Sequence, residues 1–283
     1  MSFWESIRLR WSVANTMVCV GLDPDLERIR RILLAAGDPA ADASAEDALY
    51  AFNRRIIDAT ADLAAVFKPQ IAHYAACGEE GLRALKRTIT YIHTRRPEVP
   101  VILDAKRGDI GSTAERYAQE VFEHFEADAV TVNPYLGGDS LEPFLAWEDR
   151  GVFVLCRTSN PSARELQDLP VCTDGRPLYQ EVARLAAEQW NSRGNLGLVM
   201  GATYPDDLRA VRAIAGDMPF LVPGVGAQGG DVNAAVANGK DSAGTGLLVN
   251  SSRGILYASM GADFEAAARN AAQALRDAIN AAR

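Results

Sequence analysis

Residues 101–133 read VILDAKRGDIGSTAERYAQEVFEHFEADAVTVN, and this stretch decides the fold. Apolar runs at 101–103 and 129–132 flank a charged segment and a predicted helix over 112–125. The runs do not alternate between apolar and polar residues, which indicates strands that are buried on both faces of a parallel sheet. Parallel strands need a crossover connection, and the helix between them supplies it. The stretch therefore predicts one strand–helix–strand unit.

The same succession of strand and helix extends over most of the chain. Short apolar runs predict eight strands, at 17–21, 64–67, 101–103, 129–132, 152–155, 196–200, 220–222 and 245–249. The segments between and after them predict helices over 44–63, 78–95, 112–125, 140–150, 178–193, 206–215, 231–238 and 262–282. Eight such units are typical of an α/β protein with a (β/α)8 TIM barrel, and a doubly wound open sheet with fewer strands is the competing architecture. We expect the barrel, as a single domain over residues 1–283.

Two segments interrupt this succession. Residues 35–45 (AAGDPAADASA) are rich in alanine and aspartate and predict a surface insertion. Residues 160–177 contain three prolines and predict a long loop, which in a compact domain is usually functional or flexible. Ser112 and Glu115 have the spacing of a capping box, which predicts a capped helix start at Ser112.

The composition is that of an ordinary globular protein. Of the 283 residues, 48% are hydrophobic and 23% are charged, which excludes a disordered or fibrous chain. No apolar run is long enough for a transmembrane helix, and residues 1–17 lack the apolar core of a secretory signal. The net charge of −8 argues against a protein that coats nucleic acid or binds an anionic membrane. It leaves room for a small anionic substrate in a local basic pocket.

The cysteines give no sign of a metal site. They are Cys19, Cys77, Cys156 and Cys172, and no two of them have CxxC spacing. The three histidines do not cluster with them in the sequence, so we expect no zinc site. A reducing cytoplasm is the simplest location for such a chain.

Charged residues gather at the predicted ends of the strands, where the active site of a (β/α)8 barrel lies. Asp23 follows the first run, Lys68 the second, Asp104, Lys106 and Asp109 the third, and Arg253 the eighth. One lysine at a strand end is usually only solvated. Several charges at one rim are costly to desolvate unless they pair or act on a ligand, so this rim is the candidate active site.

The segment VILDAKRGD at 101–109 is the most specific part of this rim. Because side chains alternate along a strand, we expect Asp104 and Lys106 on the same side. Asp109 can reach back toward them, in its own subunit or in a neighbouring one. A lysine between carboxylates stays protonated, which makes it a good proton donor and a poor Schiff-base nucleophile. A salt-bridge network that only closes the barrel is the alternative.

Three further features indicate ligand contacts. The loop PGVGAQGG at 223–230 leads into a helix and can expose backbone N–H groups to a phosphate, with Gln228 and Arg253 as further donors, although an ordinary turn would also contain glycines. Ser159 can read a planar amide such as that of a pyrimidine, or serve only the Asn-Pro turn that follows it. Thr113 is either a ligand contact or a capping residue in the first turn of a helix.

Together these features resemble the orotidine 5′-monophosphate decarboxylase family. The resemblance rests on the D-x-K-x-x-D-I motif at 104–110, on Lys68 and on PGVGAQGG, and it extends from Asp23 to Arg253. The segment NPYLGGD at 133–139 is similar to the longer, type 2 bacterial branch of the family. One departure is visible, because Ser252-Arg253-Gly254 stands where many members have Gly-Arg. The arginine is kept, but the departure puts a backbone phosphate contact at Ser252 in doubt.

The resemblance implies a homodimeric barrel with two shared active sites. It implies a carboxy-lyase of pyrimidine biosynthesis that converts orotidine 5′-monophosphate (OMP) to uridine 5′-monophosphate (UMP). Lys106 would protonate C6 of the pyrimidine, Asp104 would lie beside the departing carboxylate, and Asp109 of the partner subunit would complete an alternating Asp/Lys array with Lys68. The implied ligand contacts are ribose for Asp23 and Lys68, pyrimidine for Ser159, and phosphate for Gln228 and Arg253. Thr113 would lie at the dimer interface.

The implied mechanism follows from the charges. The substrate offers no electron sink for the electrons that CO2 leaves behind, so preorganised charge must stabilise a carbanion at C6. This scheme requires no metal or organic cofactor, and the loops 160–177 and 223–230 are candidates for closure over the substrate. We expect a small nucleotide as substrate, and neither nucleic acid nor membrane as a partner.

Two other functions compete with this interpretation. A metal-dependent sugar-phosphate lyase or synthase of the same suprafamily would share the Asp-x-Lys-x-x-Asp motif. It would, however, need an acidic metal ligand where Lys68 stands. A non-catalytic nucleotide-binding barrel would have no need of a charged proton donor at Lys106.

Overall fold

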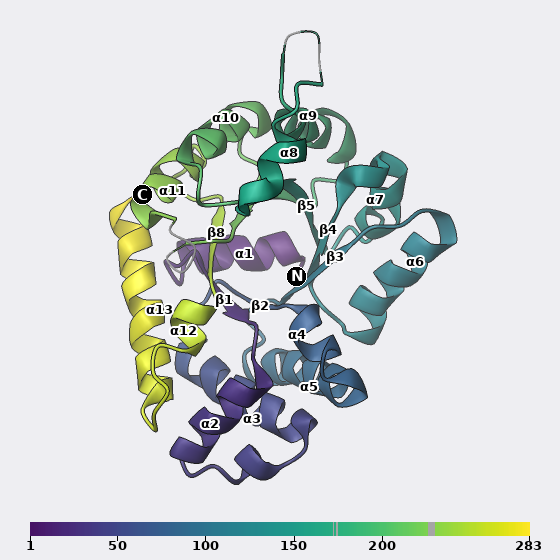
Figure 1. Cartoon of the computed structure of the whole chain (residues 1–283). Helices are drawn as coiled ribbons and strands as arrows, with labels where there is room; N and C mark the ends of the chain where they lie inside the picture. The colour runs from purple at the N-terminus through teal and green to yellow at the C-terminus, as the bar shows by residue number, and fades with distance from the viewer. Residues whose placement is uncertain (172, 174, 226–229) are drawn as a thin grey trace.

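A computed structural model describes residues 1–171, 173, 175–225 and 230–283 of the chain. Its eight strands form one parallel sheet in the order β2-β1-β8-β7-β6-β5-β4-β3. They are β1 (Val18–Leu22), β2 (Val66–Pro69), β3 (Ile102–Arg107), β4 (Ala129–Val132), β5 (Gly151–Arg157), β6 (Leu196–Met200), β7 (Phe220–Val222) and β8 (Leu247–Ser251). Isolated bridges from Phe67 to Val101 and from Gln70 to Asp104 join β2 to β3 and close the sheet. The fold is therefore the predicted (β/α)8 TIM barrel (Figure 1).

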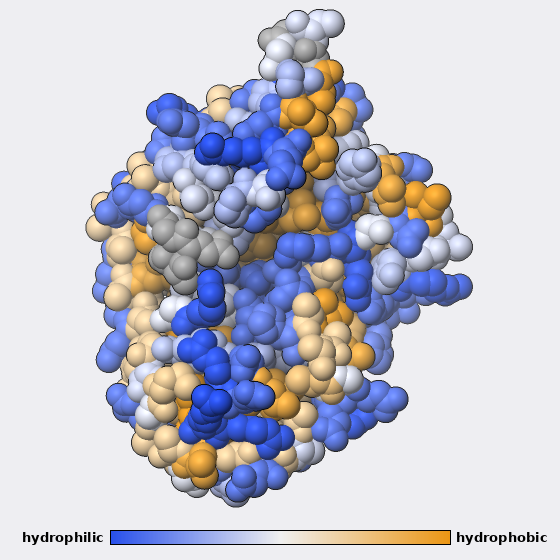
Figure 2. All heavy atoms as spheres, viewed as in Figure 1, coloured by the Kyte–Doolittle hydropathy of each residue, from blue (hydrophilic) through white to orange (hydrophobic). Residues whose placement is uncertain are grey.

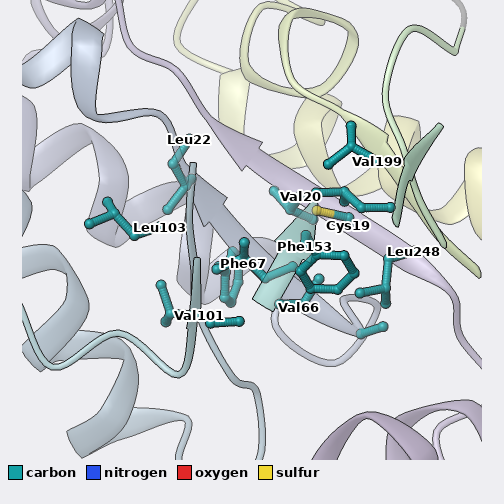
Figure 3. Packing of buried hydrophobic residues seen from close by; sticks show 14 of the residues in the cluster. Cys19, Val20, Leu22, Val66, Phe67, Val101, Leu103, Phe153, Val199 and Leu248 are labelled. Atoms are coloured by element: carbon teal, nitrogen blue, oxygen red, sulfur yellow. The ribbon is translucent and has the colours of Figure 1, made fainter. Parts of the chain in front are cut away.

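The strands are buried on both faces, as their apolar composition predicts. Every residue of β1, β2, β4, β6 and β7 is buried. Apolar side chains from several strands, among them Phe67, Val101, Phe153 and Leu248, lie close together in the core (Figure 3). The largest difference from the predicted strands is in β3, which continues from its apolar start through the charged residues to Arg107.

An outer ring of helices covers the sheet (Figure 1). The predicted helices are present as α3 (Ala45–Thr60), α5 (Gly78–Arg95), α6 (Gly111–Gln119), α7 (Gly138–Leu145), α9 (Leu178–Leu185), α10 (Pro205–Ala215), α11 (Val232–Gly239) and α13 (Phe264–Ala281). Two of them continue as π-helical turns, η2 (Glu120–His124) after α6 and η5 (Ala186–Trp190) after α9. The remaining helices were not predicted and are α1 (Phe3–Ser12), α2 (Leu26–Ala35), η1 (Pro39–Asp42), α4 (Ile71–Ala75), η3 (Pro134–Leu136), η4 (Pro161–Ala163), α8 (Arg164–Gln167) and α12 (Arg253–Leu256).

The capping box predicted at Ser112 is wrong. Helix α6 begins one residue earlier, at Gly111, and its N-cap residue Ile110 makes no side-chain hydrogen bond to the helix. Gly111 has a φ of +54°, a conformation that suits glycine. The chain therefore enters α6 through the backbone freedom of this glycine rather than through a serine cap.

Helix α1 closes the N-terminal end of the barrel and lies across its centre in Figure 1. The rings of Phe3 and Trp4 pack against Phe153 of β5, with centroids 5.9 and 5.3 Å away. Trp11 Nε1 donates to the carbonyl oxygen of Leu247 at 3.0 Å, and Arg10 Nε donates to that of Ala64 at 2.9 Å. Since both carbonyls lie at the N-terminal ends of strands, α1 covers this end of the barrel.

The two irregular segments have different structures. In residues 35–45, η1 packs back onto α2, because Arg30 donates to the carbonyl oxygens of Ala41 at 2.5 Å and Ala43 at 2.8 Å. Residues 160–177 contain η4 and α8 (Figure 1), and an antiparallel bridge joins Pro170 to Pro177. Within the described part of the chain, no helix is both long and apolar enough to span a membrane.

Candidate active site

A cavity of about 720 Å³ opens at the C-terminal end of the barrel. The middle of this face is hollowed and hydrophilic in Figure 2. Six of the nine predicted site residues line the cavity, namely Asp23, Lys68, Asp104, Lys106, Ser159 and Arg253. Lys68 lies in β2, Asp104 and Lys106 lie in β3, and the other three residues follow β1, β5 and β8. The parallel sheet thus brings together residues that are far apart in the sequence.

Four charged side chains form a chain of alternating sign across the cavity floor. Lys68 Nζ lies 3.7 Å from Asp23 Oδ1 and 3.0 Å from Asp104 Oδ2. Lys106 Nζ lies 2.7 Å from the other oxygen of Asp104, Oδ1. The side chain of Lys68 is only 4% exposed, whereas that of Lys106 is 46% exposed. Lys106 is therefore the more accessible of the two lysines to a ligand.

The pKa values of the buried pair are set by competition between burial and neighbouring charges. Burial alone would lower the pKa of Lys68, but the carboxylates of Asp104 and Asp23 outweigh this effect and raise it above its usual range. Burial alone would raise the pKa of Asp104, but Lys68, Lys106 and a hydrogen bond from Thr131 hold it well below its usual range. Both groups are therefore charged at neutral pH.

The backbone of β3 is irregular where it carries Asp104 and Lys106. Lys106 has a φ of +46°, in the left-handed region that non-glycine residues rarely adopt. The register of β3 on β4 shifts between Leu103 and Arg107. Asp104 and Lys106 do converge as predicted, but regular strand alternation is not the reason. The departure from regular strand geometry at Lys106 brings its ammonium to Asp104, and such strain is common at functional sites.

Thr131 of β4 stabilises this irregular backbone, and sequence reasoning missed it. Its Oγ1 accepts hydrogen bonds from the backbone N–H groups of Ala105 at 3.1 Å and Lys106 at 3.0 Å. The same hydroxyl donates to Asp104 Oδ1 at 2.8 Å. One buried hydroxyl thus fixes both the turn at Lys106 and the orientation of the Asp104 carboxylate.

Two predicted residues do not line the cavity of their own chain. Asp109 follows β3, and its Oδ1 accepts a hydrogen bond from the backbone N–H of Ile110 at 2.8 Å. Thr113 is exposed in the first turn of α6. In this structure, Asp109 therefore lies outside the cavity of its own chain.

The side of the cavity near β7 and β8 holds one of the two predicted phosphate contacts, Arg253. Arg253 begins α12 and lines the cavity, as do Pro223, Gly224 and Val225. Gln228 lies outside the described residues. Ser252 also lines the cavity, and its Oγ would be only 1.9 Å from a Cβ on Gly21. Glycine at position 21 is therefore what allows Ser252 to occupy this place.

Ser159 lines the cavity on the side of β5, together with its neighbours Thr158 and Asn160. A Cβ on Gly201 would lie 2.9 Å from the backbone nitrogen of Ser159, so glycine is needed for β6 to approach this loop. In the sheet, β5 is separated from β8 by β6 and β7, which places Ser159 across the cavity from Arg253.

Several cavity residues come from helices that the sequence pattern did not predict. Arg28 of α2 and His73 of α4 line the cavity, as does Tyr257, which follows α12. The Arg28 guanidinium lies 4.0 Å from the centroid of the Tyr257 ring, and the Tyr257 hydroxyl accepts from the backbone N–H of Asp25 at 2.7 Å. These contacts form the outer rim of the site beside β1 and β8.

The donor set in the cavity does not favour a divalent cation. Among the described residues, no group of three or more histidines, cysteines, aspartates or glutamates is placed to hold a metal ion. Two of the carboxylates that line the cavity, Asp23 and Asp104, both lie beside the Lys68 ammonium. A second cation at that position would be repelled.

Comparisons with known proteins agree with the geometry. Residues 16–271 match the family model "Orotidine 5′-phosphate decarboxylase / HUMPS family". Among curated proteins, the chain is similar to the orotidine 5′-phosphate decarboxylases of Cellvibrio japonicus (55% identical over 283 residues) and Azoarcus sp. (56% over 284 residues), with 100% of each chain covered. Among solved structures, it resembles the OMP decarboxylase of Leishmania donovani, with 39% identity, a TM-score of 0.85, and 100% of this chain and 99% of that one covered.

Proposed function

The chain belongs to the orotidine 5′-phosphate decarboxylase family and converts OMP to UMP, and we propose that this reaction takes place on the charge chain Asp23–Lys68–Asp104–Lys106. One observation carries the proposal. Lys106 is the last member of this series of charges and is held 2.7 Å from Asp104. Of Lys68 and Lys106, it is the one that is well exposed to the cavity.

Lys106 is the proton donor in this proposal. The bond between C6 and the carboxylate carbon breaks, CO2 leaves, and the electron pair remains on C6. The Lys106 ammonium stabilises that developing charge and then transfers a proton to C6, which gives UMP and a neutral amine that regains its proton from water. The buried positive charge of Lys68 keeps Asp104 ionised throughout.

Asp104 lies where it can act on the carboxylate that departs. The negative charge of Asp104 would repel the carboxylate of the bound substrate. This repulsion is weaker in the transition state, because the negative charge of the substrate then moves from its carboxylate toward C6. Binding energy from the phosphate, which is remote from the reacting atoms, can offset this repulsion.

The ends of the cavity fit the other parts of the nucleotide. We assign the phosphate to Arg253 and Gln228, the ribose to Asp23 and Lys68, and the pyrimidine to Ser159. The position of Arg253 across the cavity from Ser159 supports this assignment, because a nucleotide binds with its phosphate and base at opposite ends.

We propose that the active enzyme is a homodimer, with Asp109 and Thr113 completing the site of the partner. Three exposed apolar residues support this face as the interface: Ile110 is 56% exposed, Tyr135 is 76% exposed and Leu136 is 47% exposed. They follow β3 and β4, which are neighbours in the sheet, and so lie beside Asp109 and Thr113. Exposed apolar residues of this kind mark interaction surfaces when they gather on one face.

We place this enzyme in the cytoplasm, with a nucleotide as its small-molecule partner and without nucleic acid or membrane partners. The net charge of −8 and the free thiols of Cys19, Cys77 and Cys156 support this assignment.

The loss of OMP absorbance in the presence of EDTA tests the metal-free mechanism. We expect the purified enzyme to decarboxylate OMP at the same rate with and without the chelator, because Lys68 and Lys106 supply the positive charge. A rate that falls with EDTA and returns with magnesium would instead favour the metal-dependent lyase or synthase chemistry of the same suprafamily. Binding of UMP without any turnover of OMP would favour a nucleotide-binding barrel.

A further inference from the structure

We propose that Arg157 is a positioning residue that fixes the loop 158–160 against the outer helices. This loop faces the pyrimidine in the function proposed above, so the inference rests on that function and deepens it. Arg157 ends β5 and is 2% exposed, yet it takes no part in the charge chain of the active site. A buried guanidinium next to a substrate loop requires an explanation, because burying a charge is costly unless it is well paired.

The guanidinium of Arg157 is held on several sides. Its Nη1 lies 2.7 Å from Asp168 Oδ1, just after α8, and its Nε lies 2.8 Å from Asp207 Oδ2, in the first turn of α10. The ring centroids of Tyr179 and Tyr204 lie 5.1 and 4.9 Å from its central carbon. Two carboxylates and two aromatic rings give a planar guanidinium one orientation, which an ammonium could not reproduce.

Gln167 of α8 connects this cluster to the loop. Its Oε1 accepts from the backbone N–H of Thr158 at 3.0 Å and from Arg157 Nη1 at 3.4 Å. Its Nε2 donates to Thr158 Oγ1 at 2.8 Å, and that hydroxyl donates to Asn160 Oδ1 at 2.7 Å. The hydrogen bonds therefore run from the buried cation, through α8, to the loop that lines the cavity.

The backbone before the loop is also constrained, by its pairing with β6. The register of β5 on β6 shifts between Leu155, which pairs with Val199, and Arg157, which pairs with Met200. This extra residue lets Arg157 reach the helices while the residues that follow it line the cavity. The carbonyl oxygen of Arg157 accepts from the backbone N–H of Gly201 at 2.8 Å. A loop that is held in this way before the ligand arrives loses less conformational entropy on binding.

Two inhibitors separate positioning of the pyrimidine loop from a merely structural role. UMP contains the pyrimidine, and ribose 5-phosphate contains only the other half of the molecule. We expect Gln167→Ala, which removes the link between the cluster and Thr158, to weaken competitive inhibition by UMP about tenfold, since two hydrogen bonds are lost. Inhibition by ribose 5-phosphate should stay within about twofold of wild type, because the loop does not contact it.

Arg157→Lys tests the centre of the cluster, because it keeps the charge but loses the planar fork. We expect the same selective loss of UMP binding. The matched control is Asp206→Asn, since Asp206 neighbours Asp207 on α10 but pairs with the exposed Arg209 instead of Arg157, and it should leave both inhibition constants unchanged. If Arg157→Lys fails to fold, Gln167→Ala decides the question alone.

Equal weakening of both inhibitors in the Gln167→Ala variant, or weakening of neither, would overturn the positioning role. Ser159→Ala is measured alongside. If it weakens UMP while Gln167→Ala does not, the positioning role fails and the pyrimidine contact of Ser159 stands. If Gln167→Ala weakens UMP while Ser159→Ala does not, the assigned contact of Ser159 fails and the positioning role stands.

Discussion

Asp104 accepts hydrogen bonds from three side chains, those of Lys68, Lys106 and Thr131. Both of its oxygens are engaged, so the carboxylate is fixed in orientation before any substrate arrives. Fixed charges stabilise a transition state without the cost of reorganising at the moment of reaction. The same carboxylate that acts on the substrate thus also holds the proton donor in place.

The pKa shifts of Asp104 and Lys68 predict how stability depends on pH. The pKa of Asp104 is lowered by folding, so its contribution is present above its unfolded pKa of about 3.9 and is lost as pH falls toward the folded value. The pKa of Lys68 is raised by folding, so its contribution is present below its unfolded pKa of about 10.4 and is lost as pH rises toward the folded value. Between these limits both charges contribute.

We therefore expect Asp104→Asn to lower the free energy of unfolding by about 3–5 kcal/mol at pH 7, because it leaves the buried Lys68 with Asp23 alone. The deficit should shrink as the pH falls below about 4, since the wild-type protein then begins to lose the contribution of Asp104 and the variant has none to lose. Urea unfolding at several pH values measures this difference. If the deficit in unfolding free energy is the same at pH 7 and pH 3, it does not come from the loss of the Asp104 charge.

At the residue scale, the sequence predicts the charged residues of the site but not the residues that hold them in place. Asp23, Lys68, Asp104 and Lys106 were found because charge directly after an apolar run is unusual. Thr131 was missed because threonine inside the run AVTV is also an ordinary strand residue. Nothing in its sequence context indicates that its hydroxyl meets the backbone of the next strand.

At the scale of elements, the strands and the long helices follow from local patterns, whereas the short helices do not. Helices α4, α8 and α12 span only four or five residues, too few for helical periodicity to emerge. His73 and Gln167 lie on such helices and were missed for that reason. The left-handed backbone at Lys106 could not be predicted either, because it depends on the contact with Thr131 across the sheet.

At the scale of the whole molecule, the order of strands and the common rim were predictable because parallel strands place all their C-terminal ends together. That residues 35–45 are a surface insertion remains a prediction, as does the single domain over residues 1–283. Asp109 and Thr113 lie outside the cavity of their own chain, so the shared site that we propose depends on the proposed homodimer.

Mixed dimers test whether the site is shared between subunits. In a dimer of one Asp109→Ala and one Lys106→Ala subunit, one site keeps both intact residues and the other has lost both. Random mixing of the two inactive variants should therefore restore about a quarter of wild-type activity, because half of the dimers are mixed and each has one working site.

The matched control is a mixture of Lys106→Ala with Asp104→Ala. These two residues touch within one chain, so every site of a mixed dimer carries a lesion and no activity should return. Failure of the first mixture to recover activity, in dimers shown to be mixed, would count against a shared site.

Turnover of OMP by the Lys106→Ala variant tests most directly whether Lys106 is the proton donor. We expect kcat to fall by at least about 10⁴-fold, because both the general acid and a fixed charge beside C6 are lost. UMP should still bind, since Arg253 and Ser159 remain, and this binding shows that the variant is folded. A folded Lys106→Ala enzyme that decarboxylates OMP at the wild-type rate would contradict the role assigned to Lys106.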